Sequence, residues 1–144
     1  MNAWKALTHK LGLDNVVIFH GYVPREEAFR ITGTSHVFCI TSVREDTSIV
    51  VFEVFRYGVP IIALEYCGFA TVINENCGIK IPICGRRQVI RDYVRHIDYL
   101  ATNEEERRRI SAGALERCQD FTCEAKMAVL NEIYQTAYES SRQA

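Results

Sequence analysis

The spacing of hydrophobic positions changes along this chain and divides it into strand-like and helix-like segments. Continuous apolar runs, typical of strands buried on both faces, cover Val16 to Phe19, Val37 to Thr41, Val59 to Leu64 and Ile79 to Ile83. Helical patterns cover residues 3–11, 24–29 and 48–57 between these runs. Alternating strands and helices imply right-handed crossovers and a parallel sheet. The front two-thirds therefore predict a Rossmann-like α/β fold, with helices on both faces of the sheet.

The last third of the chain carries only helical patterns. An apolar stripe at helical spacing comprises Val89, Ile90, Tyr93, Val94, Ile97 and Leu100. Asn103 is placed to begin a further helix, and Thr122 a final one. In that final helix we expect Met127, Leu130, Tyr134 and Ala137 to face inward. We interpret residues 1–144 as one domain, with a Rossmann-like core over about 1–84 and a helical part over about 85–144.

Composition and charge exclude several classes of partner. Lys and Arg number 17 against 18 Asp and Glu, so no basic surplus suggests nucleic acid. No apolar run approaches the roughly 18 residues of a transmembrane helix. The first residues lack the apolar segment of a secretory signal, which favours the cytoplasm.

Six cysteines are present, and none forms a C-x-x-C pair. In a cytoplasmic setting this favours reduced thiols with a structural role. A thiol- or metal-based role for Cys77, Cys84, Cys118 and Cys123 is the alternative.

The segment from Ser42 to Glu53 is the strongest candidate for a binding site. It follows a predicted parallel strand, and open α/β sheets bind ligands at the carboxyl ends of their strands. Thr47 and Ser48 lead directly into a helix, whose first free N–H groups suit a phosphate. An ordinary helix cap is the alternative interpretation of these two residues.

Glu53 is a single carboxylate in an otherwise apolar helix. Burying such a group is costly unless it is hydrogen-bonded, and the two hydroxyls of a ribose could both donate to it. The alternatives are a position at the open edge of the helix or an ion pair with Arg56.

Glu45 and Glu53 also define an E-x7-E motif between Thr41-Ser42 and the run from Tyr57 to Ala63. With this motif the chain resembles the family 4 type of retaining glycosyltransferases, which have the GT-B fold. Other segments resemble the family in the same order, and they cover nearly the whole chain. These are residues 11–16, 19–23, 67–73, 77–82, 121–122 and 133–134.

The resemblance implies a role for each matched residue. Glu53 would hold the ribose of a nucleoside diphosphate sugar, and Glu45 would orient the donor sugar as the catalytic-site carboxylate. The backbone N–H groups of Thr47, Ser48 and Ile49 would bind the diphosphate. Gly21, Tyr22 and Val23 would line the base pocket. The family needs no metal and no permanently bound cofactor, because backbone amides and basic side chains stabilise the departing diphosphate.

Departures from the family pattern lead to further expectations. The family has a small residue at the position of Asp46 and a Glu near Thr71, and this chain starts after the strands that carry its Arg and Lys pair. The N-terminal domain that binds the acceptor is also missing, so a partner chain or the rest of a longer enzyme is implied. A non-catalytic nucleotide-binding or interaction module is the alternative. A sheet without its first strands is expected to expose an apolar edge and to self-associate.

Overall fold

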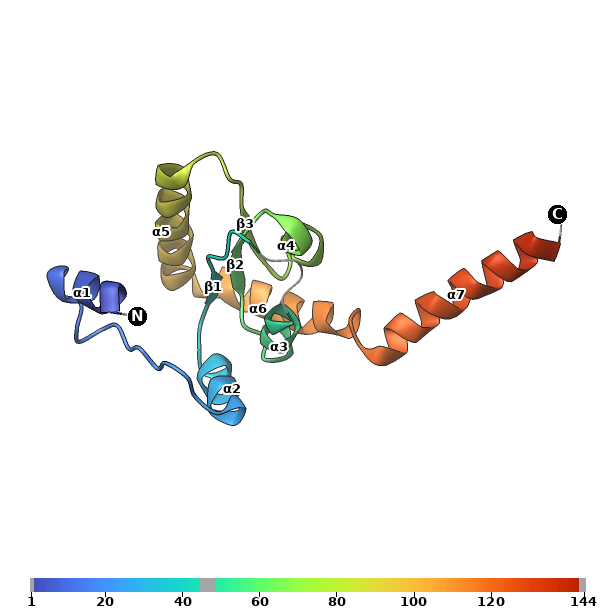
Figure 1. Ribbon diagram of the computed structural model, residues 1–144, viewed down its shortest axis with the longest axis horizontal. Helices are drawn as coiled ribbons and strands as arrows, with labels where there is room; N and C mark the ends of the chain where they lie inside the picture. Colours follow the sequence, from blue (N-terminus) through green and yellow to red (C-terminus); the bar gives the residue numbers. More distant parts are fainter. Residues whose placement is uncertain (1, 45–48, 143–144) are drawn as a thin grey trace.

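The computed structural model describes residues 2–44 and 49–142 as seven helices and three strands (Figure 1). In chain order these are α1 (Asn2–Lys10), α2 (Arg25–Gly33), β1 (Phe38–Ile40), α3 (Val50–Arg56), β2 (Ile61–Leu64), α4 (Cys67–Val72), β3 (Gly78–Ile81), α5 (Arg86–Thr102), α6 (Glu104–Gln119) and α7 (Cys123–Arg142).

The three strands form one parallel sheet in the order β1-β2-β3. Phe38 lies beside Ile61, and Ile61 lies beside Gly78, so the strands start at the same end of the sheet. Strands β1, β2 and β3 were predicted as residues 37–41, 59–64 and 79–83. All three are confirmed; β1 and β2 are shorter than predicted, and β3 begins one residue earlier and ends two residues earlier. Helices follow each strand, so the predicted α/β class is confirmed.

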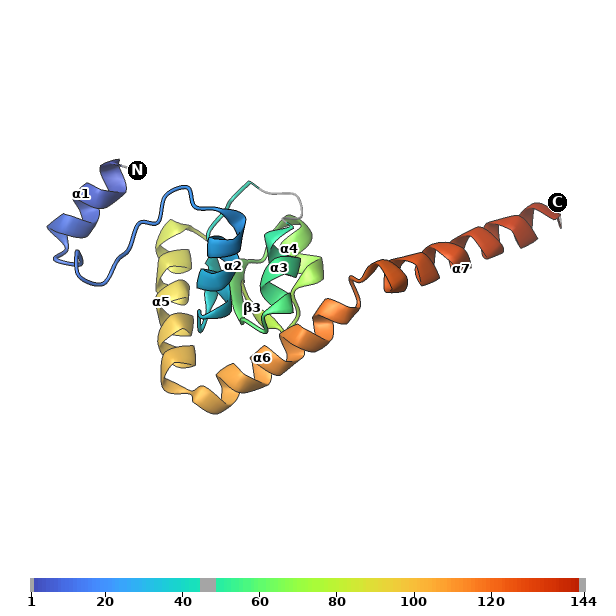
Figure 2. The same ribbon diagram turned by 90° about the horizontal axis from the view of Figure 1, so that it is seen from below.

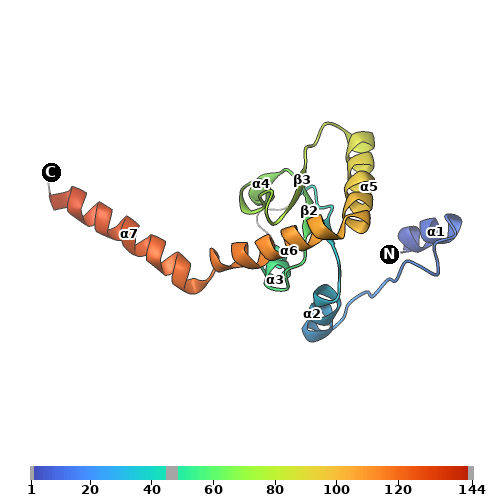
Figure 3. The ribbon, with the colours of Figure 1, turned by 180° about the vertical axis from the view of Figure 1, so that it is seen from behind.

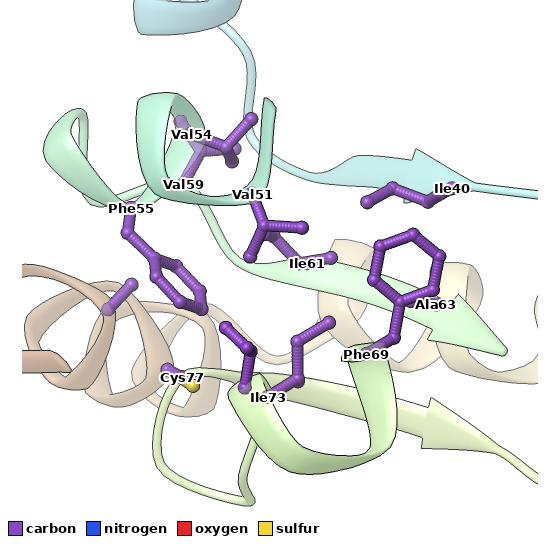
Figure 4. Packing of buried hydrophobic residues seen from close by; sticks show 12 residues of the cluster. Ile40, Val51, Val54, Phe55, Val59, Ile61, Ala63, Phe69, Ile73 and Cys77 are labelled. Carbon is purple, nitrogen blue, oxygen red and sulfur yellow. The ribbon is translucent and has the colours of Figure 1, made fainter. Parts of the chain in front are cut away.

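The core lies on both faces of β2, whose four side chains are all at most 2% exposed. Ile61 and Ala63 belong to a cluster with apolar residues of α3 and α4, including Val51, Phe55 and Phe69 (Figure 4). Ile62 and Leu64 point the other way, into a cluster with Ile81 and residues of α5 and α6. Figure 2 shows α5 and the pair α3–α4 on opposite sides of the strands, with α6 crossing below them. Alternate side chains of one strand thus hold both helical layers.

A close backbone approach fixes α6 against the turn before β3. A Cβ atom on Gly113 would lie 2.0 Å from the carbonyl oxygen of Asn76, so this contact requires glycine. On the same turn, the Arg109 guanidinium donates to the Glu75 carbonyl at 3.1 Å. Helix α6 therefore packs against the connection between β2 and β3 and holds the turn that precedes β3.

Two further expectations about the elements are corrected by the structure. Val16 to Phe19 form no strand, and their side chains are 37–75% exposed in the segment between α1 and α2. A strand needs a hydrogen-bonded neighbour, and β1 pairs with β2 alone in the described part of the chain. Helix α4 was not expected from the sequence, because six residues are too few to show a helical period.

The apolar stripes of the C-terminal helices are also less buried than expected. In α5, Tyr93 and Leu100 are buried, whereas Ile90, Val94 and Ile97 are 41–55% exposed. Helix α7 buries no residue and extends away from the sheet in all three ribbon views (Figure 3). Met127, Leu130, Tyr134 and Ala137 are exposed, so the inward orientation predicted for them is wrong. Their spacing specifies a one-sided helix, but no described segment covers that side.

The hydroxyl of Tyr93 donates to the carbonyl of Ile40, the last residue of β1. This bond joins α5 to the carboxyl end of the edge strand across 53 positions of sequence. We expect Tyr93→Phe to lower the free energy of unfolding by about 1–3 kcal/mol, because a buried carbonyl loses its partner. Chemical denaturation measures the change, with the exposed Tyr134 providing a matched control as Tyr134→Phe. An equal effect of the two substitutions would contradict a specific role for Tyr93.

The same tyrosine predicts a pH dependence of stability. Burial raises the pKa of Tyr93 to about 12, above the roughly 10 of an unfolded tyrosine. Between these values the unfolded chain has released the phenol proton and the folded chain has kept it, so stability falls as pH rises. The stability difference between the unaltered chain and Tyr93→Phe should therefore be largest below pH 10 and shrink towards pH 12. Denaturation curves at several pH values test this expectation, which a constant difference would overturn.

The unpaired side of β1 leads to a prediction about association. Cys39 in this strand is exposed, and so are Ile90, Val94 and Ile97 of α5. Unpaired apolar edges pair with other chains, and a charged side chain on the edge opposes this. We expect the chain under reducing conditions to associate with rising concentration in sedimentation velocity, and Cys39→Lys to reduce the association. Cys84→Lys, at an exposed cysteine outside the sheet, should leave it unchanged. A chain that stays monomeric at high concentration would refute the prediction.

Candidate functional site

The candidate site lies at the carboxyl edge of the sheet, where β1 ends and α3 begins. Each helix of a right-handed crossover runs against its strands, so helix starts gather at this edge. Glu45, Thr47 and Ser48 lie outside the described residues. Ile49 is described, precedes α3, and accepts the N–H groups of Phe52 and Glu53 at 3.1 and 3.2 Å. No side chain of the described residues caps this helix start. The N–H groups of the first turn are thus not used by a capping side chain there.

Glu53 lies in α3 with its side chain 29% exposed. Its Oε1 atom accepts a hydrogen bond of 2.8 Å from the guanidinium of Arg25, at the start of α2. The open-edge position considered for Glu53 is therefore found, and the alternative pairing with Arg56 is wrong. Arg56 is one turn further along α3 and is exposed. A carboxylate that is half-buried beside a cation and faces solvent remains available to a ligand.

Arg25 is held in place by the packing of α2 on α3. Pro24 precedes it with φ −56°, the value that suits a helix start. The Arg25 guanidinium lies 4.9 Å from the ring centroid of Phe29. The Phe29 ring in turn contacts Tyr57 at the end of α3, with 6.0 Å between centroids. Aromatic packing therefore sets the distance between the helix that carries Arg25 and the helix that carries Glu53.

The residues predicted to line a base pocket lie directly before Arg25. Gly21 has φ 67°, a left-handed conformation that glycine adopts without strain. Tyr22 is fully exposed and Val23 is half-buried. Because only Pro24 separates this turn from Arg25, the Arg25–Glu53 contact brings the turn to the side of α3. Two segments 28 positions apart are thereby joined at one edge.

Arg25 is the residue of this site that sequence reasoning missed. The cost of burying Glu53 predicts exposure or a hydrogen-bonding partner, and Arg56 is the arginine that the sequence analysis offers as that partner. The topology indicates Arg25 as the partner, since α2 precedes β1 and therefore also begins at the carboxyl edge.

A strained residue lies on the same edge, after β2. Cys67 has φ 48°, which is unusual for a residue other than glycine. A hydrogen bond with Cys67 raises the pKa of Tyr66, the residue before it. Both side chains are exposed, and they follow the middle strand of the sheet.

Arg44 and Lys80 are basic residues that could stabilise a bound phosphate, but the structure shows neither of them at the start of α3. Lys80 donates to the carbonyl of Ala70 at 2.8 Å and lies 3.8 Å from the carboxylate of Glu65. It therefore stabilises the region of α4. Arg44 is exposed next to residues outside the description.

A cavity of about 550 Å³ lies between β3, α5 and α6, and Glu65 and Lys80 are part of its wall. Two pairs of its charged groups contact one another, Glu106–Arg109 at 2.7 Å and Glu65–Lys80 at 3.8 Å. Burial lowers the pKa of His96 in its wall. The cavity shares no residue with the site predicted from the sequence, and the topology argument favours the carboxyl edge over it.

All six cysteines are free thiols, and Cys77 alone is buried. Burial raises the pKa of Cys77, which favours its neutral form. Cys39 belongs to the run 37–41, whose pattern is typical of a strand buried on both faces, and it is instead exposed on β1. No group of three or more His, Cys, Asp or Glu in the described parts of the chain could hold a metal ion. Nor is any helix described there long and apolar enough to cross a membrane.

The parallel sheet and its helices on both faces define the α/β class of fold, and comparison with known proteins identifies the family. The family "Glycosyl transferases group 1" matches residues 2–117. The chain therefore belongs to this family, as its resemblance predicted.

Three similar proteins show the extent of the match. A D-inositol 3-phosphate glycosyltransferase of Kribbella flavida is 26% identical over 135 residues, which cover 93% of this chain and 31% of that protein. Sucrose-phosphate synthase from Thermosynechococcus elongatus superposes with a TM-score of 0.70 at 23% identity, over 96% of this chain and 34% of that one. The C-terminal domain of a glycosyl transferase group 1 family protein from Francisella tularensis gives a TM-score of 0.71 at 16% identity, over 83% of this chain and 60% of that one.

The two structural likenesses confirm the expected fold, half of the GT-B architecture. This chain spans about a third of the length of the inositol-phosphate glycosyltransferase. Its similarity therefore concerns one part of such an enzyme.

Proposed function

We propose that this chain is the donor-binding domain of a retaining glycosyltransferase, and that it takes a sugar bound to a nucleoside diphosphate. The observation that carries the proposal is the contact between Arg25 and Glu53. It supports the proposal because Pro24 alone separates the turn predicted to hold the base from Arg25, whose guanidinium contacts the carboxylate predicted to hold the ribose. Base and ribose are adjacent in a nucleotide, so the two predicted subsites have the required order.

The ribose subsite is the carboxylate of Glu53. Carboxylate oxygens accept several hydrogen bonds, so one carboxylate can serve Arg25 and both ribose hydroxyls. Its partial exposure leaves a path for a ligand. Gly21, Tyr22 and Val23 supply the adjoining base subsite, where the exposed Tyr22 ring offers a surface for stacking.

The diphosphate subsite is the start of α3. The N–H group of Ile49, together with those of Thr47 and Ser48, would face the phosphates, and Glu45 would orient the donor sugar. A helix start favours an anion because its free N–H groups and its dipole both carry positive charge. No metal is required in this scheme, since the amide groups and basic side chains take the charge of the departing diphosphate.

Sugar transfer requires an acceptor site in addition to the donor site. The acceptor has to be aligned with the donor sugar, and that alignment accounts for a large part of the barrier reduction. We propose that an N-terminal acceptor-binding domain or a partner chain closes over the carboxyl edge. The exposed apolar sides of α1 and α7 are surfaces that such a partner would cover.

A nucleotide-binding module without catalysis is the second candidate. The observation that favours it is the engagement of Lys80 with α4, which leaves no lysine of the described residues shown at the start of α3. Both candidates share the nucleotide site and differ in sugar transfer.

Binding of nucleotides tests the site directly. We expect the chain to bind UDP, GDP or one of their sugar conjugates in titration calorimetry, and Glu53→Gln to weaken that binding by at least about tenfold. Hydrogen bonds to a charged group contribute roughly 1.5–3 kcal/mol, which corresponds to this loss.

Glu27 provides the matched control. Its carboxylate pairs with Arg30 on α2 at 2.7 Å, and this hydrogen bond lowers the pKa of Glu27. Glu27→Gln should leave nucleotide affinity unchanged. Absence of binding at millimolar nucleotide, or equal losses in the two variants, would refute the donor site.

A further inference from the structure

We propose that Arg25 is a positioning residue for nucleotide recognition, which holds Glu53 so that its free oxygen meets the ribose hydroxyls. The inference rests on the proposed donor site and adds to it a residue outside the E-x7-E motif. Arg25 itself touches no part of the sugar in this scheme. It acts through the carboxylate of Glu53.

The geometry of the pair supports this role. The hydrogen bond from Arg25 uses Oε1 of Glu53, and Oε2 accepts no hydrogen bond from the described part of the chain. A glutamate side chain has three rotatable bonds, and a contact at one oxygen restricts where the other oxygen points. Arg25 is restricted in turn, because its guanidinium lies over the Phe29 ring.

The exposure of the Arg25–Glu53 pair indicates that the pair contributes little to the stability of the fold. The side chain of Arg25 is 73% exposed and that of Glu53 is 29% exposed. Ion pairs at such exposure contribute little to folding. Arg30 on the same helix makes a similar contact with Glu27, at 65% and 39% exposure, but within one helix turn. The pair of Arg25 differs because it joins two elements at the edge where ligands bind.

The positioning role predicts that the effect of Arg25 on nucleotide affinity depends on the ribose hydroxyls. Hydroxyl groups of the ribose donate to the carboxylate, and a fixed acceptor binds them with a smaller entropy cost than a mobile one. A nucleotide that lacks the 2′-hydroxyl should lose part of this benefit. Removing Arg25 should therefore lower the affinity for ribonucleotides more than the affinity for 2′-deoxyribonucleotides.

Calorimetric titration of the 144-residue chain with UDP, GDP and their 2′-deoxy forms tests the inference. In Arg25→Ala we expect the ribonucleotide to bind about three- to tenfold more weakly, because binding must then immobilise the Glu53 side chain. The preference for ribose over 2′-deoxyribose should fall by a similar factor. Arg25→Lys should restore part of both, since it keeps the charge. The melting temperature of each variant, measured in parallel, should stay close to that of the unaltered chain.

Two controls separate positioning from general damage. Arg30→Ala should change neither the affinity nor the ribose preference. In a Glu53→Gln background, Arg25→Ala should add little, because the two residues act through one contact.

Each other outcome counts against one of the two proposals. Equal weakening of ribo- and deoxyribonucleotides in Arg25→Ala, or no change at all, would overturn the role of Arg25 while leaving the donor site intact. Failure of the unaltered chain to bind either nucleotide would overturn the donor site and this inference with it.

Discussion

The four side chains of β2 alternate between two apolar clusters, and this two-sided burial places the other elements of the core. Ile61 and Ala63 require a cover on one face, which α3 and α4 provide. Ile62 and Leu64 require a cover on the other, which α5 and α6 provide. A strand buried in this way cannot shift its register by one residue without exchanging its two sets of partners. The sheet, its order and its helical layers all follow from satisfying both faces of β2.

The candidate site is a consequence of the same arrangement. Because helices return against their strands, the starts of α2 and α3 lie at the carboxyl edge of the sheet. Arg25 and Glu53 stand near these starts and meet there, although 28 positions separate them in the chain. The packing of Phe29 against Tyr57 fixes the spacing of the two helices. A polar contact with functional potential therefore depends on an apolar contact one turn away.

The uncovered surfaces have a common physical origin. Helices α1 and α7 satisfy their backbone hydrogen bonds within the helix, so their hydrogen bonding requires no neighbouring segment. Val16 to Phe19 cannot do the same, because a strand takes its hydrogen bonds from a neighbour. The outcome is two helices with exposed apolar sides and one exposed apolar run. A chain that matches about a third of the length of its relatives is consistent with such surfaces.

Local sequence patterns determined which segments became helices and strands of the core. Apolar runs gave three of the four expected strands, and helical spacing gave α1, α2, α3, α5 and the two last helices. The E-x7-E motif and its neighbouring segments indicated the family that comparison then showed. These features depend on residues close together in the sequence, so their spacing carries the information.

Tertiary structure alone decided which of these patterns found partners. The apolar runs at 16–19 and 37–41 look alike in sequence, yet only the second has a strand beside it. Apolar residues recur at helical spacing in both α5 and α7, yet only α5 meets the sheet. The cost of burying Glu53 predicts exposure or a hydrogen-bonding partner, and the pairing with Arg25 instead of Arg56 results from the return of α2 to the edge of the sheet. Local spacing fixes the shape and polarity of a segment, whereas burial and pairing depend on what the rest of the chain brings to its side.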